Sequence, residues 1–129
     1  MYIFLDYLFV VFHGSLIVFI LTGWIWSKTR RFHLLVMTLT FSSWVGLGFF
    51  YGFGYCPSTD WHWRVKEALG ETDLPDTYVK YYLDRVTGLD WPPVLVHALI
   101  LVFAVTALGV SVALNWRDWR RSRAARITQ

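Results

Sequence analysis

Three long stretches that are nearly free of charge limit what this chain of 129 residues can fold into. They cover residues 2–26, 32–55 and 93–116, and Asp6 is the only charged side chain within them. A stretch of about 20 apolar residues crosses a bilayer as a helix, because its backbone polar groups must find partners inside the chain. The sequence therefore predicts an all-α integral membrane protein with three transmembrane helices, folded as a single membrane domain over residues 1–129.

The composition agrees with a membrane location. Apolar residues make up 56% of the chain, charged residues make up only 16%, and the mean hydropathy is +0.43. A soluble domain usually carries about a quarter charged residues. Trp24, Trp26, Trp91 and Trp116 flank the apolar stretches, as expected for aromatic rings that collect at the headgroup level of a bilayer.

The distribution of positive charge predicts the orientation of the chain. Lys28, Arg30 and Arg31 lie between the first two stretches, and the tail at residues 117–129 carries five arginines against one aspartate. The segment at residues 56–91 instead holds seven acids and four bases. Because positive residues are retained on the cytoplasmic side, we expect the N-terminus outside and the basic tail in the cytoplasm.

The extracytoplasmic segment predicts two short interfacial helices. The first covers residues 61–69 before Gly70, and the second covers residues 76–87, with Asp76 as its N-cap and Gly88 as its stop. Both helices carry an aromatic side, and we expect the charged side, which includes Lys66 and Lys80, to face water.

Ionisable residues inside the apolar stretches are costly and are therefore candidates for function. Asp6 and His13 share one face of the first helix. His97 lies roughly 8 Å inside the outer end of the third helix at the usual helical rise. These depths allow a contact between Asp6 and His97, and they allow His13 to bond Ser42 or Ser43.

The same two histidines, His13 and His97, raise the alternative of a membrane redox module that binds haem or a quinone. A b-type haem needs two imidazoles at nearly one level on opposite sides of the ring, and the predicted depths of these two differ. We therefore expect packing histidines and no bound cofactor, with haem b as the alternative. His33 adjoins the basic turn and is expected in the inner headgroup region.

A second alternative is an extracytoplasmic thiol or metal site at Cys56 and His62, with Asp60 nearby. Zinc sites normally show three or four ligands at recognisable spacing, whereas this group offers a single cysteine, one histidine and one carboxylate. A helix cap and an interfacial ring are the simpler interpretation of these residues. We expect no metal.

Small residues recur at three- or four-residue spacing on two of the predicted spans. On the third helix they are Ala104, Ala107 and Ser111. Small residues let helices approach closely, and in lipid this packing drives helix association. The pattern predicts packing within the bundle, or against a membrane-protein partner or a second copy of the chain. The residues of the second helix that follow this spacing are Ser42, Gly46, Gly48 and Gly52.

The segment GYCPSTDWHWR at residues 54–64, followed by Leu74, Pro75 and a tyrosine-rich helix, resembles domain-of-unknown-function family 2784, a group of small bacterial inner-membrane proteins. The similarity extends from about residue 12 to residue 112. It implies a bacterial inner-membrane location, but it carries no reaction. It also implies an extracytoplasmic loop whose characteristic residues are Cys56, Pro57, Thr59, Trp61 and Arg64.

No known catalytic motif occurs in the sequence, and the short basic tail gives no reason to expect nucleic-acid binding. The favoured function is therefore a non-catalytic membrane subunit or accessory protein that binds lipid and partner helices. The residues that this interpretation assigns to structural or partner contacts are Asp6, Ser42, Gly46, Gly48, Gly52, Cys56, Pro57, Thr59, Asp60, Trp61, His62 and Arg64.

Overall fold

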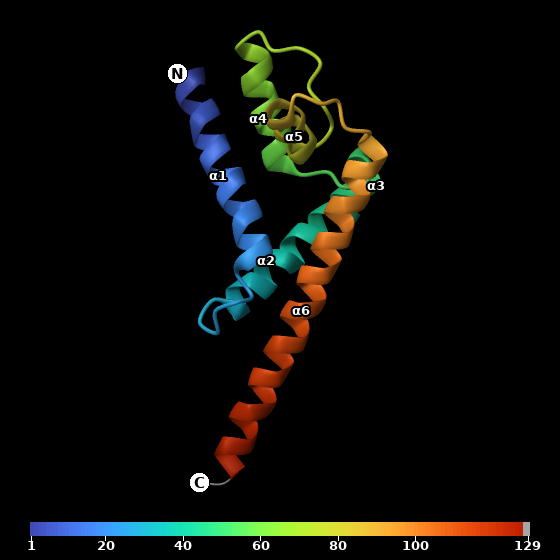
Figure 1. The fold of residues 1–129 in the computed structure, drawn as a ribbon. Helices are drawn as coiled ribbons and strands as arrows, with labels where there is room; N and C mark the ends of the chain where they lie inside the picture. Colours follow the sequence, from blue (N-terminus) through green and yellow to red (C-terminus); the bar gives the residue numbers. More distant parts are fainter. Residues whose placement is uncertain (128–129) are drawn as a thin grey trace.

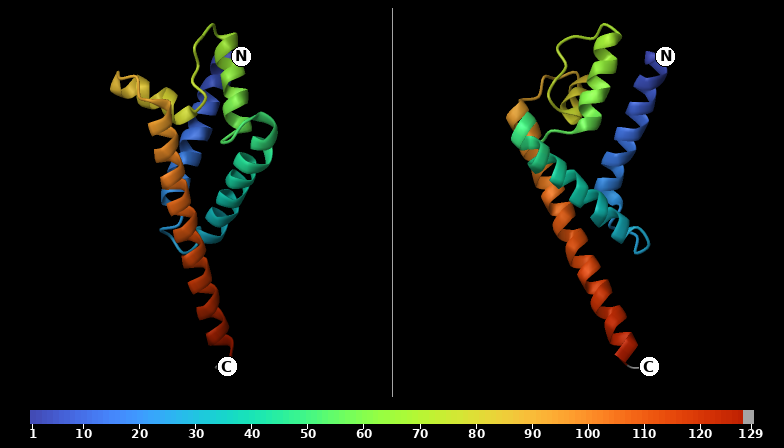
Figure 2. Two further views of the ribbon diagram at one scale, coloured as in Figure 1. Left: turned by 90° about the vertical axis from the view of Figure 1, so that its right-hand side faces the viewer. Right: turned by 180° about the vertical axis from the view of Figure 1, so that it is seen from behind.

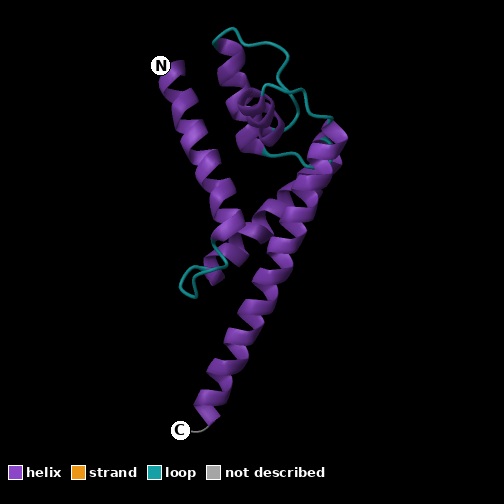
Figure 3. Cartoon of the chain, in the orientation of Figure 1, coloured by secondary structure: helices purple, strands orange, loops and turns teal. Residues whose placement is uncertain are grey.

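The computed structural model describes residues 1–127, and in these residues the chain is helical with no strand (Figure 1, Figure 3). Three helical stretches are long and apolar enough to cross a membrane. This confirms the predicted all-α architecture with three spans. In chain order the elements of the spans are α1 (Tyr2–Thr22), α2 (Arg30–Ser42), the π-helix η1 (Ser43–Leu47), α3 (Gly48–Tyr51) and α6 (Pro93–Ile127).

The ends of the spans differ from the predicted boundaries. The first helix ends at Thr22 rather than at residue 26, and the second span begins at Arg30 and ends at Tyr51. Gly52 stops this second span because its φ of 103° lies outside the helical region. The third helix continues through the basic tail to Ile127, so the tail extends one long helix.

The second span ends in a close turn that contains two of the predicted small residues, Gly48 and Gly52. Ser43, in the π-helical segment, donates its hydroxyl to the Tyr55 carbonyl at 3.0 Å, so the chain folds back on the end of the helix. A Cβ on Gly48 would lie 3.2 Å from the Phe53 Cα. Gly48 and Gly52 therefore form this turn, and their packing against a partner stays a prediction.

The core of the spans lies between α2 and α6. Met37 is fully buried and packs with Ala104 and Ala107, while Ser111 is also buried. The small-residue face predicted on the third helix is therefore a packing face within the bundle. On the second span, Ser42 and Gly46 are exposed instead.

His33 joins all three spans, a role that the sequence analysis did not predict, and its expected level at the inner headgroups stays a prediction. The side chain is fully buried. Its Nε2 lies 2.9 Å from the Ile20 carbonyl of α1, and its Nδ1 lies 2.9 Å from the Ser111 hydroxyl of α6. Because a carbonyl only accepts, Nε2 carries the proton, and in the neutral ring Nδ1 accepts from Ser111. One imidazole thus fixes the crossing of the three helices.

Above this crossing α1 diverges from α6, and residues 56–91, here called the head, fill the space between them (Figure 1, Figure 2). The head contains α4 (Pro57–Ala68) and α5 (Tyr78–Thr87). Helix α4 packs along α1, and α5 packs against α6. The N-terminus lies at the head end, and α6 carries the C-terminal tail to the opposite end (Figure 1).

The two predicted helices of the head exist, with shifted starts. Helix α4 begins at Pro57 instead of residue 61, because proline is favoured in the first helical turn, where an N–H is not needed. Helix α5 begins at Tyr78, and Thr77 rather than Asp76 caps it by accepting from the Lys80 N–H at 3.4 Å. Gly88 closes α5 in the left-handed conformation, as predicted.

Candidate functional site

A buried ion network joins the head to α1. Lys66 of α4 is only 2% exposed, and its Nζ lies 3.0 Å from Asp6 of α1 and 3.2 Å from Glu71. The expectation that Lys66 faces water is therefore wrong. The reason is that Asp6, an acid inside an apolar helix, needs a cation, and α4 lies along that helix.

The electrostatics of the network favour the charged forms of its members. Burial alone would lower the pKa of the Lys66 ammonium, but hydrogen bonds to Asp6, Tyr81 and Glu71 outweigh burial and raise it. Burial alone would raise the pKa of Glu71, but hydrogen bonds from Tyr81 and Lys66 outweigh burial and lower it. Arg85 adds a second cation, 2.9 Å from Glu71 and stacked over the Tyr81 ring.

His62 is the second residue of α4 that reaches α1. Its Nε2 lies 2.7 Å from Asp6, and its ring stacks on Phe9. The side chain is fully buried, and its Nδ1 finds no hydrogen-bond partner within residues 1–127. Burial lowers the pKa of His62, although the hydrogen bond to Asp6 opposes this shift. The neutral ring therefore donates from Nε2 to the carboxylate, and Nδ1 remains a bare acceptor.

His13 follows Asp6 by seven residues, or about two turns of α1, and it also faces the head. Its ring stacks on Tyr78 with 4.1 Å between centroids and 3° between planes, and its Nδ1 lies 3.2 Å from the Ser58 hydroxyl. Tyr78 in turn donates its hydroxyl to the Val10 carbonyl. The expected bond from His13 to Ser42 or Ser43 is wrong, because the head and not α2 covers this face of α1.

The remaining candidate histidine belongs to another contact. His97 of α6 is partly exposed and lies 3.1 Å from Asp76, just before α5. The expected Asp6 to His97 contact is wrong, since Asp6 pairs with α4 instead. His13 and His97 thus have different partners, and one face of the His13 ring is covered by Tyr78. Haem binding by this pair stays an untested alternative.

Cys56 and His62 are not brought together as a pair of ligands. The Cys56 Sγ lies 3.2 Å from the Ser58 hydroxyl, so the thiol is linked through Ser58 to His13, whereas His62 bonds Asp6. Within residues 1–127, no group of three or more His, Cys, Asp or Glu side chains is arranged to hold a metal ion.

A second buried lysine, Lys80 of α5, holds together the side of the head that adjoins α6. Lys80 is 7% exposed, and its Nζ donates to Asp84, Asp90 and the Trp91 carbonyl at 2.6–2.7 Å. Hydrogen bonds to Asp84 and Asp90 raise the pKa of this ammonium. Lys80 therefore ties α5 to the segment that leads into α6, and its predicted exposure to water is also wrong.

The other residues of the head motif divide between core and surface. Thr59 is buried, and Pro57 starts α4. Asp60 and Arg64 form an ion pair of 3.2 Å one turn apart, with the Arg64 side chain largely exposed. Trp61 is also exposed. These last three residues form the outer surface of α4.

A family model described as Protein of Unknown function (DUF2784) matches residues 3–116. The chain belongs to this family. In this DUF2784 protein the matched residues include the head and the apolar part of every span. Comparison with curated proteins and with solved structures found no similar protein.

The sequence interpretation of this DUF2784 protein missed Lys66, Glu71 and Tyr78 as partners of the α1 face. A helical pattern could have identified the first, because Lys66 follows His62 by four residues and so lies on the same side of α4. The shared face of Asp6 and His13 was predicted, and both residues do face the head. The ion network of Asp6, Lys66 and Glu71 attaches the head to α1.

Proposed function

We propose that this protein is a non-catalytic accessory subunit of a larger complex in the bacterial inner membrane, and that α1 binds a transmembrane helix of the partner. The observation that carries the proposal is a shallow groove of about 560 Å³ along α1. The residues that line it are Val10, Val11, Gly14, Ser15, Val18, Phe19 and Thr22.

The chemistry of the groove suits a helix. A Cβ on Gly14 would meet nothing within 4 Å, so another backbone can approach there. The neighbouring Ser15 is exposed, and its hydroxyl has no hydrogen-bond partner among residues 1–127. By contrast, the exposed Thr38 and Thr106 bond carbonyls of their own helices. Hydrocarbon offers Ser15 no partner, whereas a neighbouring helix does.

The contacts that attach α1 to the rest of the protein support the same function. The head holds α1 through Asp6 and His13, and His33 holds it through the Ile20 carbonyl near its other end. Only 6% of the apolar window of α1 is buried within the protein. The helix is therefore held near its start, at its midpoint and near its end, while the face that carries the groove stays uncovered.

The charge distribution supports an orientation with the head outside and the tail in the cytoplasm. Lys28 lies in the turn between α1 and α2, and Arg30 and Arg31 begin α2, at the end opposite the head; α6 carries five further arginines beyond its apolar part. In the head, the buried lysines and acids are paired with one another, which supports a structural role for these charges.

Photo-crosslinking in living cells tests the proposal. Benzoylphenylalanine is introduced in place of Val11 or Ser15, which line the groove, and in place of Val112 as a control on the exposed surface of α6. Both groove positions are expected to crosslink the same membrane protein, identified by mass spectrometry. The control position is expected to crosslink only lipid.

Two glycines, one in the groove and one on α6, provide a test variant and its matched control. Gly14→Leu fills the groove, whereas Gly109→Leu adds the same side chain on α6, where a Cβ also meets nothing within 4 Å. Gly14→Leu is expected to abolish the crosslink, and Gly109→Leu is expected to leave it intact. Crosslinks from the groove to lipid alone would refute the proposal. Crosslinks to a second copy of the chain would replace the partner by a homo-oligomer.

A further inference from the structure

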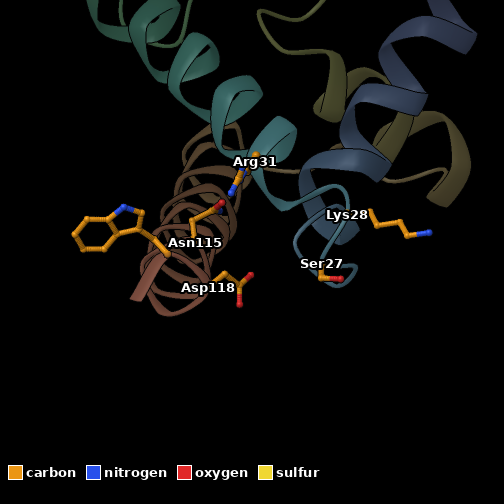
Figure 4. Close-up of a pocket in the computed structure, with 6 residues that line it drawn as sticks. Ser27, Lys28, Arg31, Asn115 and Asp118 are labelled. Carbon is orange, nitrogen blue, oxygen red and sulfur yellow. The ribbon is translucent and has the colours of Figure 1, made fainter. Parts of the chain in front are cut away.

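A cavity of about 800 Å³ lies at the end of the molecule opposite the head, between the α1–α2 turn and α6. Figure 4 shows Arg31 beside Asn115 at this cavity, with Ser27 and Lys28 on the side of the turn. The cavity lies where the apolar part of the spans ends, which is the level of the lipid headgroups. Its lining residues are Ser27, Lys28, Arg31, Asn115, Asp118 and Trp119.

The cavity has an excess of positive charge. Asp118 is the one acid that lines it, and the carboxylate already pairs with Arg30 at 2.8 Å and with Arg117 at 3.9 Å. The ion pairs formed within residues 1–127 leave Lys28 and Arg31 without an acidic partner. Two cations therefore remain free to bind an anion.

The side chains that hold the walls of this cavity together are different from the two cations that remain unpaired. Arg30 donates to the Trp24 carbonyl at 3.0 Å as well as to Asp118, so it closes the turn. Asn115 donates to the Arg30 carbonyl at 3.0 Å and fixes α6 against the start of α2. Arg31, the next residue, makes no side-chain hydrogen bond or ion pair with any other of residues 1–127. Arg30 and Asn115 thus hold the walls in place, and Lys28 and Arg31 are not needed for this.

We propose that this cavity binds the phosphate group of an anionic phospholipid. A guanidinium fork matches phosphate oxygens. The Lys28 side chain points away from Arg31 in Figure 4, and its long flexible stem lets the ammonium turn back to add a second charge. Trp119, at the rim, suits the headgroup region, and the apolar surfaces of the spans begin beside it for the acyl chains. The site does not depend on the partner proposed for α1.

Lipid binding by the full-length protein in mild detergent tests this site. The probe is fluorescent phosphatidylglycerol, followed by anisotropy, with phosphatidylcholine and sodium phosphate as competitors. Unlabelled phosphatidylglycerol is expected to displace the probe, whereas phosphatidylcholine and millimolar phosphate are not. Equal displacement by phosphatidylcholine would overturn the proposal, and equal displacement by phosphate would assign the site to the free ion instead of a lipid.

A charge-matched pair of variants locates the site. The double variant Lys28→Gln, Arg31→Gln removes the free cations of the cavity and is expected to bind the probe roughly thirtyfold more weakly. The control Arg120→Gln, Arg126→Gln removes two charges from the tail outside the cavity and is expected to change binding by less than about threefold. Equal losses in the two variants would show a diffuse surface and overturn the proposal.

Discussion

Replacement of Lys66 by methionine tests the network that holds the head on α1. The change keeps the length of the side chain but removes the ammonium that lies 3.0 Å from Asp6 and 3.2 Å from Glu71. Loss of one partner of a buried ion pair costs about 3–5 kcal/mol, because the other charge stays buried without compensation. Here the acids retain 21% and 28% exposure, which favours the lower end, about 3 kcal/mol.

Arg85 offers a control on the same carboxylate. It also pairs with Glu71, at 2.9 Å, but its side chain is 58% exposed. An exposed pair of this kind contributes only about 0–1 kcal/mol. Arg85→Gln therefore removes the same charge next to the same acid, and we expect it to have little effect on the stability of the head.

Hydrogen exchange of the α4 amides in lipid nanodiscs measures the local free energy of opening. For Lys66→Met, a loss of about 3 kcal/mol corresponds to exchange a little over a hundredfold faster, while the α2 and α6 amides near Met37 keep their protection. Equal and small effects of Lys66→Met and Arg85→Gln would refute the reasoning, because burial of the lysine would then make no difference.

Three further outcomes are expected. Gly23→Ala lowers the midpoint of thermal unfolding, at a cost of about 1–3 kcal/mol, because its Cβ would lie 2.7–2.8 Å from the Phe19 and His33 rings. Gly14→Ala, in open space inside α1, does not lower the midpoint, because alanine is the better helix former. Burial lowers the pKa of His62 below its usual 6.5, so the unfolded chain binds the proton better than the folded chain. Unfolding midpoints are therefore expected to fall as the pH drops below about 6.5, and His62→Gln is expected to reduce this fall. The purified protein shows no Soret absorption, since His13 serves packing; a Soret band lost in His13→Ala would instead support the haem alternative.

The spans were predictable because membrane insertion depends mainly on the composition of each stretch by itself. The ends of the helices were harder to predict. Helix α4 begins at Pro57, four residues before its predicted start, and α5 uses Thr77 where Asp76 was an equally good cap. Local sequence offered several acceptable caps, and the packing of the head decides between them.

The contacts of the site were the least predictable part. Asp6 and Lys66 are 60 residues apart in the chain, and their pairing depends on α4 folding along α1 rather than over α6. His33 lies next to a basic turn, and nothing in its local sequence indicates that it reaches both Ile20 and Ser111. Depth in the membrane can be estimated from sequence, whereas the direction in which a side chain points around the helix depends on tertiary packing.

The orientation of the chain, with the head on the outer side of the membrane and the tail in the cytoplasm, is the central claim about its topology, and cysteine labelling tests it most directly. Cys56 is the only cysteine, so a Cys56→Ser background accepts Thr72→Cys in the head or Ser122→Cys in the tail. In intact spheroplasts, an impermeant maleimide is expected to label the head cysteine, and to label the tail cysteine only after permeabilisation. Labelling of the tail cysteine alone in intact spheroplasts would contradict this orientation.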